Sequence, residues 1–431
     1  MWSVKIRVQI IVLLSLFVFS QKAEAAPASL TLQHKHSLFT ITARDMQGWK
    51  EPQEQWTFEG RTAIPPASFR IDGDNLPPLP AGWERHTVAG WNTAAIMETL
   101  RKKVSAQLDR PAGSVTIGRS ASGGIVFTGL GLPGRKTDLA LAANLVTEAL
   151  EKDIGHVTLP VEETDPAITV TDPDLRDQGI REFVTVGESD YTGSPVNRRH
   201  NIAVGIARFN GTLIPKDSDF SFVKVLGPVD AKAGYRKELV IKGDRTEPDY
   251  GGGLCQISTT AYRGVWEYGF PILKRRNHSY SVHYYSPSGT DATVYPGSAD
   301  MVFRNDSPAA LLMQTYAEDG KAFFIYYGTR DDRRTELVGP FIQSGKPAPP
   351  PRTELTIEIP PGTKQKVGSP VPGLYAEWFR VITKDGKETT DRTSSIYEAR
   401  PLYTLVGVKP EELPPPEILP PAPSFDAIPG F

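Results

Sequence analysis

The chain contains a single cysteine, Cys255, among its 431 residues, so no intramolecular disulfide can hold its fold together. Its stability must come from hydrophobic cores and backbone hydrogen bonds, and a hydrophobic fraction of 39% is enough to build them. The length indicates two or three domains rather than one. Because exported proteins commonly use cysteines in pairs, a lone thiol is either buried and inert or kept for its reactivity.

The N-terminus carries the pattern of a secretory signal peptide. Lys5 and Arg7 precede an apolar run from Val8 to Ser20, and Ala23-Glu24-Ala25 forms a small-x-small cleavage site. An uncleaved membrane anchor is the alternative, but the apolar run is short for a spanning helix. We therefore expect residues 1–25 to be removed and the mature protein to be extracytoplasmic, in a periplasm, at the cell wall or secreted, with no transmembrane segment.

The balance of charge argues against one class of partner. The 48 basic and 50 acidic residues nearly cancel, whereas nucleic-acid-binding proteins usually carry a basic excess. We expect no nucleic-acid partner.

Hydrophobic periodicity and proline-rich breaks predict a multidomain α+β protein. The expected parts are a signal peptide (1–25), an N-terminal β-containing segment (26–90), a mixed α+β module (91–175), a central α+β domain of short strands (183–330), a β-rich module (353–408) and a Pro-rich disordered tail (409–431).

Several elements within these parts can be predicted individually. Asn92 is a plausible N-cap for a helix over Ala94 to Leu108. A second helix should begin near Cys255 and end near Gly269, with Pro271 just beyond. Short strands are expected over the following segments: Tyr280 to Tyr285, Ala292 to Val294, Met301 to Phe303, Ala310 to Thr315 and Ala322 to Tyr327.

The segment Gly251-Gly252-Gly253-Leu254-Cys255-Gln256 is the part of the sequence that most suggests chemistry. Glycines permit backbone conformations closed to other residues and the close approach of another chain. If the helix starts here, Cys255 lies in its first turn, where unpaired amides and the helix dipole favour a thiolate. The amides near Gly253 to Gln256 are then candidates to bind the oxyanion of a tetrahedral intermediate.

A nucleophilic cysteine usually needs a base, and His278 is the nearest downstream candidate. Asp291 is a candidate to orient its imidazole. The alternatives are that Cys255 is a small buried residue, that His278 bonds a turn and that Asp291 closes one. His283 lies in an alternating segment, so we expect it to pack on a strand surface.

The same region holds residues suited to bind a substrate. Arg275 and Arg276 suit carboxylates, although cations at the end of a helical segment are also favoured by its dipole. Further candidate contacts are Tyr250, Gly252, Gly253, Gln256 and Ser258. The histidines and the single cysteine lack the spacing of zinc ligands, so no metal or other cofactor is expected.

A set of short stretches lies around the cysteine motif in a characteristic order: Arg199-His200-Asn201-Ile202, Phe209-Asn210-Gly211-Thr212, Asp219-Phe220-Ser221-Phe222, Ala233-Gly234-Tyr235, Gly251 to Gln256, Asn277-His278-Ser279, Gly289 to Val294 and Phe303-Arg304-Asn305. Together, these stretches resemble the VanW-domain family of bacterial envelope proteins. Asn92 to about Asp172 resembles a peptidoglycan-binding module, and Leu355 to Val408 resembles a G5-like β-rich module.

The resemblance implies a vancomycin resistance protein-like envelope protein that modifies peptidoglycan. VanW domains have been linked to L,D-transpeptidation with the motif cysteine as nucleophile, which implies that Cys255 forms a thioester with a stem peptide and passes it to a neighbouring amine. His278 would shuttle protons and Asp291 would orient it. The well-known L,D-transpeptidases place the histidine before the cysteine, so their motif does not map here residue by residue. An L,D-carboxypeptidase-type hydrolase and a non-catalytic peptidoglycan-binding scaffold remain alternatives.

Overall fold

The computed structural model describes residues 29–66, 79–242 and 245–413. The predicted signal peptide lies outside the described residues, as does the predicted tail beyond residue 413. The described chain divides into two compact units. Unit 1 contains residues 29–32, 40–66, 79–99 and 140–157, and unit 2 contains residues 33–39, 100–139, 158–242 and 245–413.

Unit 1 is built on a long antiparallel pair, β3 (Lys50–Phe58) with β5 (Trp83–Trp91), and β4 (Arg61–Thr62) extends this sheet. Helix α1 (Thr93–Leu100) follows, and the Asn92 side chain accepts a hydrogen bond from the Ala95 amide at 2.9 Å. This bond confirms the predicted N-cap. The remaining elements that begin or end here are α3 (Leu139–Glu151), β1 (Ser29–His34), β2 (Ser37–Thr42) and β9 (His156–Thr158).

The helix predicted over Ala94 to Leu108 is present but not uniform. After α1 the chain forms a π-helical segment, Arg101–Ser105, and then the short helix α2 (Ala106–Leu108). Its apolar face is fully buried through Ile96, Leu100 and Val104. The sequence period therefore predicted the buried face, although it gave no indication of the π segment.

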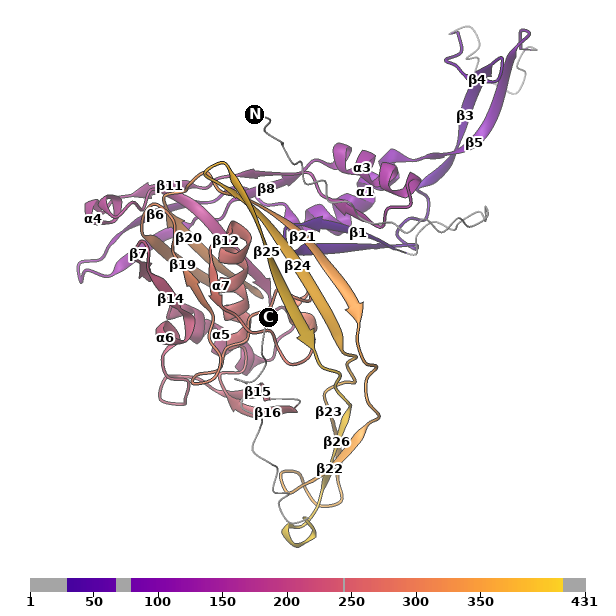
Figure 1. Ribbon diagram of the computed structural model, residues 1–431. Helices are drawn as coiled ribbons and strands as arrows, with labels where there is room; N and C mark the ends of the chain where they lie inside the picture. The colour runs from indigo at the N-terminus through magenta and orange to yellow at the C-terminus, as the bar shows by residue number, and fades with distance from the viewer. Residues whose placement is uncertain (1–28, 67–78, 243–244, 414–431) are drawn as a thin grey trace, which may run out of the picture. The chain divides into compact units, whose positions relative to one another are not determined.

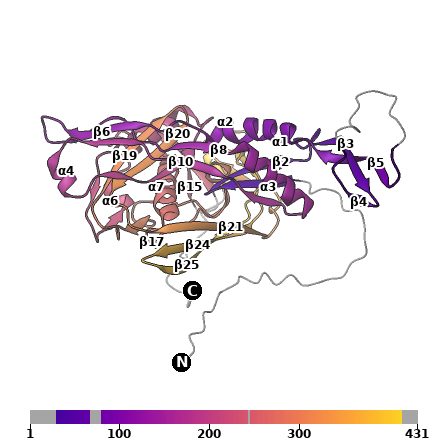
Figure 2. The same ribbon diagram turned by 90° about the horizontal axis from the view of Figure 1, so that it is seen from above.

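The centre of unit 2 is a four-stranded antiparallel sheet in the order β12-β20-β19-β13, which holds helix α7 (Leu254–Tyr268) on one face (Figure 1). The strands are β12 (Glu182–Asp190), β20 (Lys321–Gly328), β19 (Leu311–Glu318) and β13 (Leu213–Ile214). A second sheet, β21-β24-β25, covers the other side of α7, so the helix lies between two sheets (Figure 2). Its strands are β21 (Arg334–Ser344), β24 (Leu374–Lys384) and β25 (Lys387–Tyr397).

One aromatic core joins these layers. Trp266 of α7 meets Trp378 of β24 edge to face, with ring centroids 5.7 Å apart, and both side chains are fully buried. The Trp378 indole also donates a hydrogen bond to the Ser288 carbonyl at 2.9 Å. Burying side chains of this size is worth about 2–3 kcal/mol each. The C-terminal strands thus share a core with the central segment, while the predicted domain boundaries stay a prediction.

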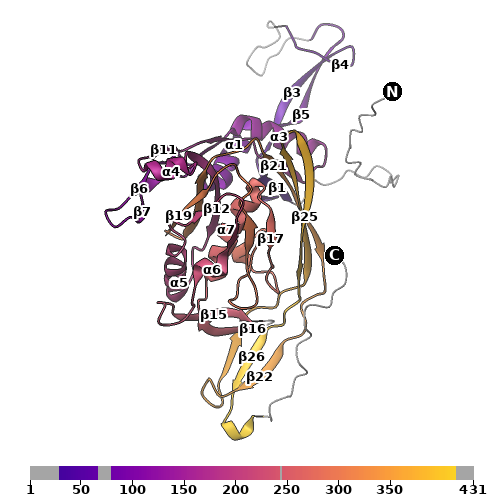
Figure 3. The same cartoon turned by 60° about the vertical axis from the view of Figure 1, so that its left-hand side comes forward.

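Helix α5 (Val196–Ala207) packs against α7 and β19, and the hairpin of β15 (Lys237–Lys242) and β16 (Arg245–Tyr250) precedes α7 directly. The other elements of unit 2 are β6 (Ser114–Arg119), β7 (Ile125–Leu130), β8 (Gly134–Thr137), β10 (Val161–Thr164), β11 (Ala167–Val170), α4 (Pro173–Asp177), β14 (Asp219–Ser221), α6 (Phe222–Leu226), β17 (Ile272–Lys274), β18 (Val302–Arg304), β22 (Arg352–Thr356), β23 (Lys364–Val367), β26 (Tyr403–Gly407) and the 3₁₀ turns His283–Tyr285 and Pro410–Glu412. Among these elements, α5 and α6 lie near α7, whereas β22 and β26 lie beyond the far end of the β15–β16 hairpin (Figure 3).

The structure confirms a multidomain α+β protein and corrects two of its predicted strands. Residues 280–285 form a loop and the 3₁₀ turn His283–Tyr285, and residues 292–294 lie in a loop rather than in a strand. The aromatic alternation from Tyr280 to Tyr285 resembled a strand. In the structure the segment is a loop whose Tyr280 and Tyr285 side chains point inward and are buried.

Candidate active site

The glycine run before α7 has the conformation and the tight packing that exclude larger residues. Gly253 is the N-cap at φ +112°, and a Cβ there would lie 3.1 Å from Arg198 Cγ and 3.2 Å from the Arg198 carbonyl oxygen. A Cβ on Gly252 would lie 2.8 Å from the Leu239 carbonyl oxygen of β15. Helix α5 and the hairpin therefore approach the loop from both sides.

Cys255 is the second residue of α7, as the sequence predicted. Its Sγ lies 3.4 Å from Thr293 Oγ1 and 3.6 Å from the Val294 carbonyl oxygen, to which the thiol can donate. The side chain is half-buried, and the first helical turn sets the positive end of the helix dipole beside it.

The backbone amides of this first turn are not equally available. The Leu254 amide donates to the Gly251 carbonyl and the Gln256 amide to the Gly253 carbonyl, each at 3.0 Å. The Cys255 amide has no backbone hydrogen-bond partner among the described residues. Of the amides proposed from sequence for an oxyanion, the Gln256 amide is thus occupied, and the Cys255 amide is the better candidate.

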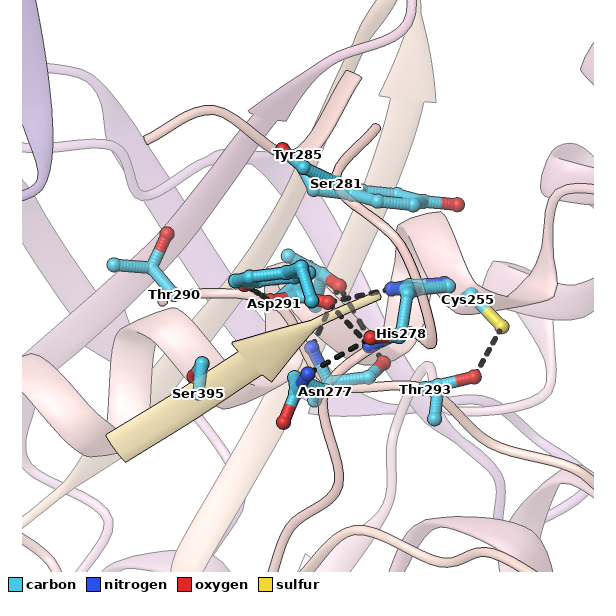
Figure 4. Close-up of polar contacts among 12 residues, drawn as sticks. Cys255, Asn277, His278, Ser281, Tyr285, Thr290, Asp291, Thr293 and Ser395 are labelled. Atoms are coloured by element: carbon cyan, nitrogen blue, oxygen red, sulfur yellow. Dashed lines mark hydrogen bonds and ion pairs between the residues drawn. The ribbon is translucent and has the colours of Figure 1, made fainter. Parts of the chain in front are cut away.

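His278 and Asp291 form a buried pair beside the cysteine (Figure 4). Asp291 Oδ2 lies 2.6 Å from His278 Nδ1 and also accepts the His278 backbone amide at 2.8 Å. This arrangement fixes the imidazole and turns Nε2 away from the carboxylate. The Nε2 atom is buried without an aligned hydrogen bond among the described residues, while the ring lies next to Cys255.

Three further side chains hold this pair in place. The Tyr285 ring stacks on the imidazole with centroids 4.3 Å apart and planes within 12°. The hydroxyl of Tyr397, from β25, donates to the other carboxylate oxygen of Asp291. Arg275 Nη2 reaches the same oxygen at 3.3 Å, and Arg275 Nε donates to the Asp291 carbonyl at 2.7 Å. Asp291 therefore has partners on both oxygens.

The electrostatics of the site favour a thiolate at Cys255 and an imidazolium at His278. Burial opposes ionisation of the thiol, but the contact with His278 and its charge outweigh it and lower the pKa of Cys255 to about 7. Burial also disfavours the charged imidazole, yet Asp291 and Cys255 raise the pKa of His278 to about 9. Burial would raise the pKa of Asp291, but His278, Arg275 and Tyr397 hold it well below its usual range.

A cavity of about 460 Å³ opens onto Cys255 and His278. The β15–β16 hairpin and the loop after His278 form its walls, which are largely apolar and aromatic. Its polar lining includes Arg198, Glu238, Asp249 and Thr293. A volume of this size accepts part of a peptide chain.

A cysteine beside a histidine that an aspartate orients is an arrangement suited to nucleophilic chemistry. Residues 197–326 match the model of the family described as "VanW like protein". This chain therefore contains a VanW-like domain at residues 197–326.

Two curated relatives carry the same similarity. The chain is 30% identical over 153 residues to the uncharacterized protein YoaR of Bacillus subtilis, covering 35% of this chain and 48% of that protein. It is 25% identical over 130 residues to the vancomycin B-type resistance protein VanW of Enterococcus faecalis, covering 29% and 47% respectively. The chain thus spans about half the length of each of these relatives.

Within the VanW domain, some of the residues predicted to contact substrate line the cavity and others do not. Tyr250, Gly252 and Gly253 lie in its wall. Gln256 is buried beneath it, where its side chain accepts a hydrogen bond from Arg198 Nη2 at 2.9 Å. Ser258 is also buried and donates to the Ala292 carbonyl, so it supports the segment after Asp291 rather than facing the cavity.

The two arginines predicted to bind substrate carboxylates lie elsewhere. The Arg275 side chain is only 7% exposed, and its guanidinium donates to Asp291, to the Gly289 carbonyl and to Ser395 Oγ at 2.8 Å. These bonds occupy it within the protein, so it positions Asp291. The Arg276 side chain is exposed and outside the cavity lining. The interpretation of both as substrate contacts is not supported by their positions.

Sequence reasoning missed Arg198 and Tyr397. Arg198 precedes the stretch that carried the resemblance, and helical periodicity alone did not reveal that it is buried beside the glycine loop. Tyr397 is more than one hundred residues from Asp291 in sequence. His283, expected on a strand surface, is instead exposed in a turn with its ring 4.1 Å from that of Tyr284.

Within the part of the chain that the structure describes, no helix has the length and apolar character needed to cross a membrane.

Proposed function

We propose that this protein is an exported, peptidoglycan-modifying cysteine acyltransferase of the L,D-transpeptidase type. The single observation that carries the proposal is the buried Asp291–His278 pair next to Cys255, at the wall of a cavity large enough for part of a peptide chain. One relative is named a vancomycin B-type resistance protein, which is consistent with a role at the cell envelope. The N-terminal pattern of residues 1–25 supports export.

In the proposed first step, the Cys255 thiolate attacks the carbonyl of the diamino acid in a donor stem peptide. The Cys255 amide and the dipole of α7 stabilise the oxyanion. The protonated His278 gives its proton to the departing amine of the terminal D-alanine, and the carbon–nitrogen bond breaks to leave a thioester on Cys255.

In the second step, the side-chain amine of a neighbouring stem attacks the thioester. His278, now neutral, accepts the amine's proton, and the thiolate leaves. Asp291 keeps the imidazole oriented and stabilises its charge in both steps. Water in place of the amine would instead give a shortened monomer.

The test is mass spectrometry of muropeptides after incubation of disaccharide-tetrapeptide with the purified protein and with Cys255→Ala. Cross-linked dimers from the wild type alone support the transpeptidase. Shortened monomers from the wild type alone would replace it with a carboxypeptidase. Binding without any change to the substrate by either protein would contradict the enzyme proposal and favour a non-catalytic scaffold.

A further inference from the structure

Arg198 is a buried cation in the wall of the cavity. It lies in the first turn of α5, and only 8% of its surface is exposed. Its Nη2 donates to Gln256 Oε1 at 2.9 Å, and its guanidinium lies 4.5 Å from the ring centre of Tyr284. The Tyr285 hydroxyl also lies near Arg198, and all three of these neighbours are uncharged.

No carboxylate of the described residues pairs with this guanidinium, and Arg198 Nη1 is buried without a hydrogen bond. Glu238 and Asp249 line the same cavity but bond the amides of Leu239 and Tyr250 instead. A buried guanidinium without an anion is costly, because the lost hydration is not replaced. Such a group at a cavity wall is suited to receive an anion from a ligand.

Arg198 lies close to the nucleophile in the fold, so an anion bound to it would lie near the reacting bond. Gln256, which holds the guanidinium, directly follows Cys255 in α7, and Arg198 packs against Gly253 in front of the nucleophile. The amide oxygen of Gln256 holds the guanidinium of Arg198 in place but does not neutralise its charge. A glutamate at this position would supply an internal counter-ion and remove the attraction for an external one.

We propose that Arg198, in the cavity wall, binds a free carboxylate that the acyl donor carries beside its scissile amide. The inference rests on the proposed function, because it assumes that Cys255 is the acceptor of the acyl group. Two groups of a stem peptide offer this chemistry: the terminal carboxylate of the leaving D-alanine and the side-chain carboxylate of diaminopimelate. Arg198 thereby restricts donors to stems that carry such a group.

Binding is measured calorimetrically with the full chain carrying Cys255→Ala, so that no turnover occurs. The three ligands are a stem tetrapeptide with diaminopimelate, the same peptide with a C-terminal carboxamide, and the same peptide with lysine in place of diaminopimelate. Loss of the recognised carboxylate should weaken binding about 10- to 100-fold. Weakening by the carboxamide identifies the leaving residue as its source, and weakening by lysine identifies the diamino acid. Equal binding of all three, or no binding of any, overturns the inference.

Two variants in the Cys255→Ala background assign the effect to Arg198. Arg198→Met should reduce the preference for the carboxylate ligand to within about 2-fold, with thermal melting as the check on folding. Gln256→Glu keeps the arginine and should weaken the carboxylate ligand about 10-fold while leaving its neutral counterpart nearly unchanged. Retained preference in either folded variant contradicts the inference.

The outcomes for binding and for catalysis separate cleanly. Carboxylate-dependent binding together with no change in muropeptides would retain the role of Arg198 and reject the acyltransferase. Cross-linked products together with carboxylate-independent binding would do the reverse.

Discussion

The hydroxyl of Tyr397 donates a hydrogen bond to Asp291 Oδ1, and through it a strand outside the matched VanW segment reaches the candidate active site. The same hydroxyl accepts the Gly289 amide at 2.7 Å. Neighbouring residues of β25 make similar contacts, since the Ile396 carbonyl accepts from the Asn277 side chain at 2.7 Å. The loop that carries His278 and Asp291 is therefore held by the C-terminal sheet.

Removal of this hydroxyl by Tyr397→Phe should lower kcat/KM for acyl transfer about 10-fold, because Asp291 loses a partner that fixes its carboxylate. The loss should vanish in an Asp291→Asn background, where there is no carboxylate to orient. Tyr316→Phe, which removes an exposed tyrosine hydroxyl of β19, is the matched control. Additive losses in the double variant would show that Tyr397 acts independently of Asp291.

The pKa values of the Cys255–His278 pair predict a bell-shaped dependence of kcat/KM on pH. Activity should rise as the thiol ionises around pH 7 and fall as the imidazolium loses its proton around pH 9. Below the pKa of Cys255 the thiol is protonated and is a poor nucleophile. Above the pKa of His278 the imidazole is neutral and cannot protonate the leaving amine. The rate of Cys255 alkylation by iodoacetamide should rise as the thiol ionises around pH 7 and should not fall again around pH 9.

The same alkylation assay tests the cause of the lowered thiol pKa. Asp291→Asn removes the carboxylate that stabilises the imidazolium, so the alkylation midpoint should move up toward the value of about 8.5 for a free thiol. A wild-type midpoint at or above that value would contradict the thiolate–imidazolium pair. An unchanged midpoint in the variant would show that Asp291 does not support it.

Gly253→Ala should destabilise unit 2 by more than the strain of a positive φ alone. Its Cβ would meet both the side chain and the carbonyl of Arg198. Gly193→Ala is the control, because Gly193 has φ +78° with nothing within 4 Å of an added Cβ. In thermal melts we expect a loss of about 1–2 kcal/mol for the control and a larger loss for Gly253→Ala. Equal losses would mean that the loop relaxes around the methyl group.

Trp378→Ala should cost about 3–5 kcal/mol, since it empties a buried site shared by α7 and the C-terminal sheet. Ile396→Ala on the neighbouring strand, where the side chain is 70% exposed, should change stability by no more than about 0.5 kcal/mol. Chemical denaturation followed by tryptophan fluorescence measures both. A small effect of Trp378→Ala would show that the C-terminal sheet folds independently of the central one.

Local sequence signals were sufficient to predict the start of α7 and the position of Cys255 in its first turn. Both predictions depend on the glycines before the helix and on the apolar periodicity after them, which lie within a few residues of each other. Local signals also led to His278 and Asp291 as a pair. They failed for residues 280–285, where aromatic alternation has the same appearance whether the rings cover a sheet or line a cavity. Here Tyr285 stacks on His278, which only the tertiary fold determines.

The supporting residues were beyond the reach of sequence for a different reason. Arg275 has the charge of a carboxylate-binding residue, but its role depends on Asp291, Gly289 and Ser395, which two other segments of the chain bring to it. Arg198 and its exposed neighbour Arg199 are indistinguishable as sequence, and only burial separates them.

Acylation of Cys255 is tested most directly by the intact mass of the protein after acid quenching of its reaction with disaccharide-tetrapeptide. We predict a mass increase equal to the donor minus its terminal D-alanine, mapped to the peptide that contains Cys255 and absent from Cys255→Ala. An unmodified wild-type protein under conditions in which the donor binds, or an adduct that persists in Cys255→Ala, would contradict the assignment of Cys255 as the nucleophile.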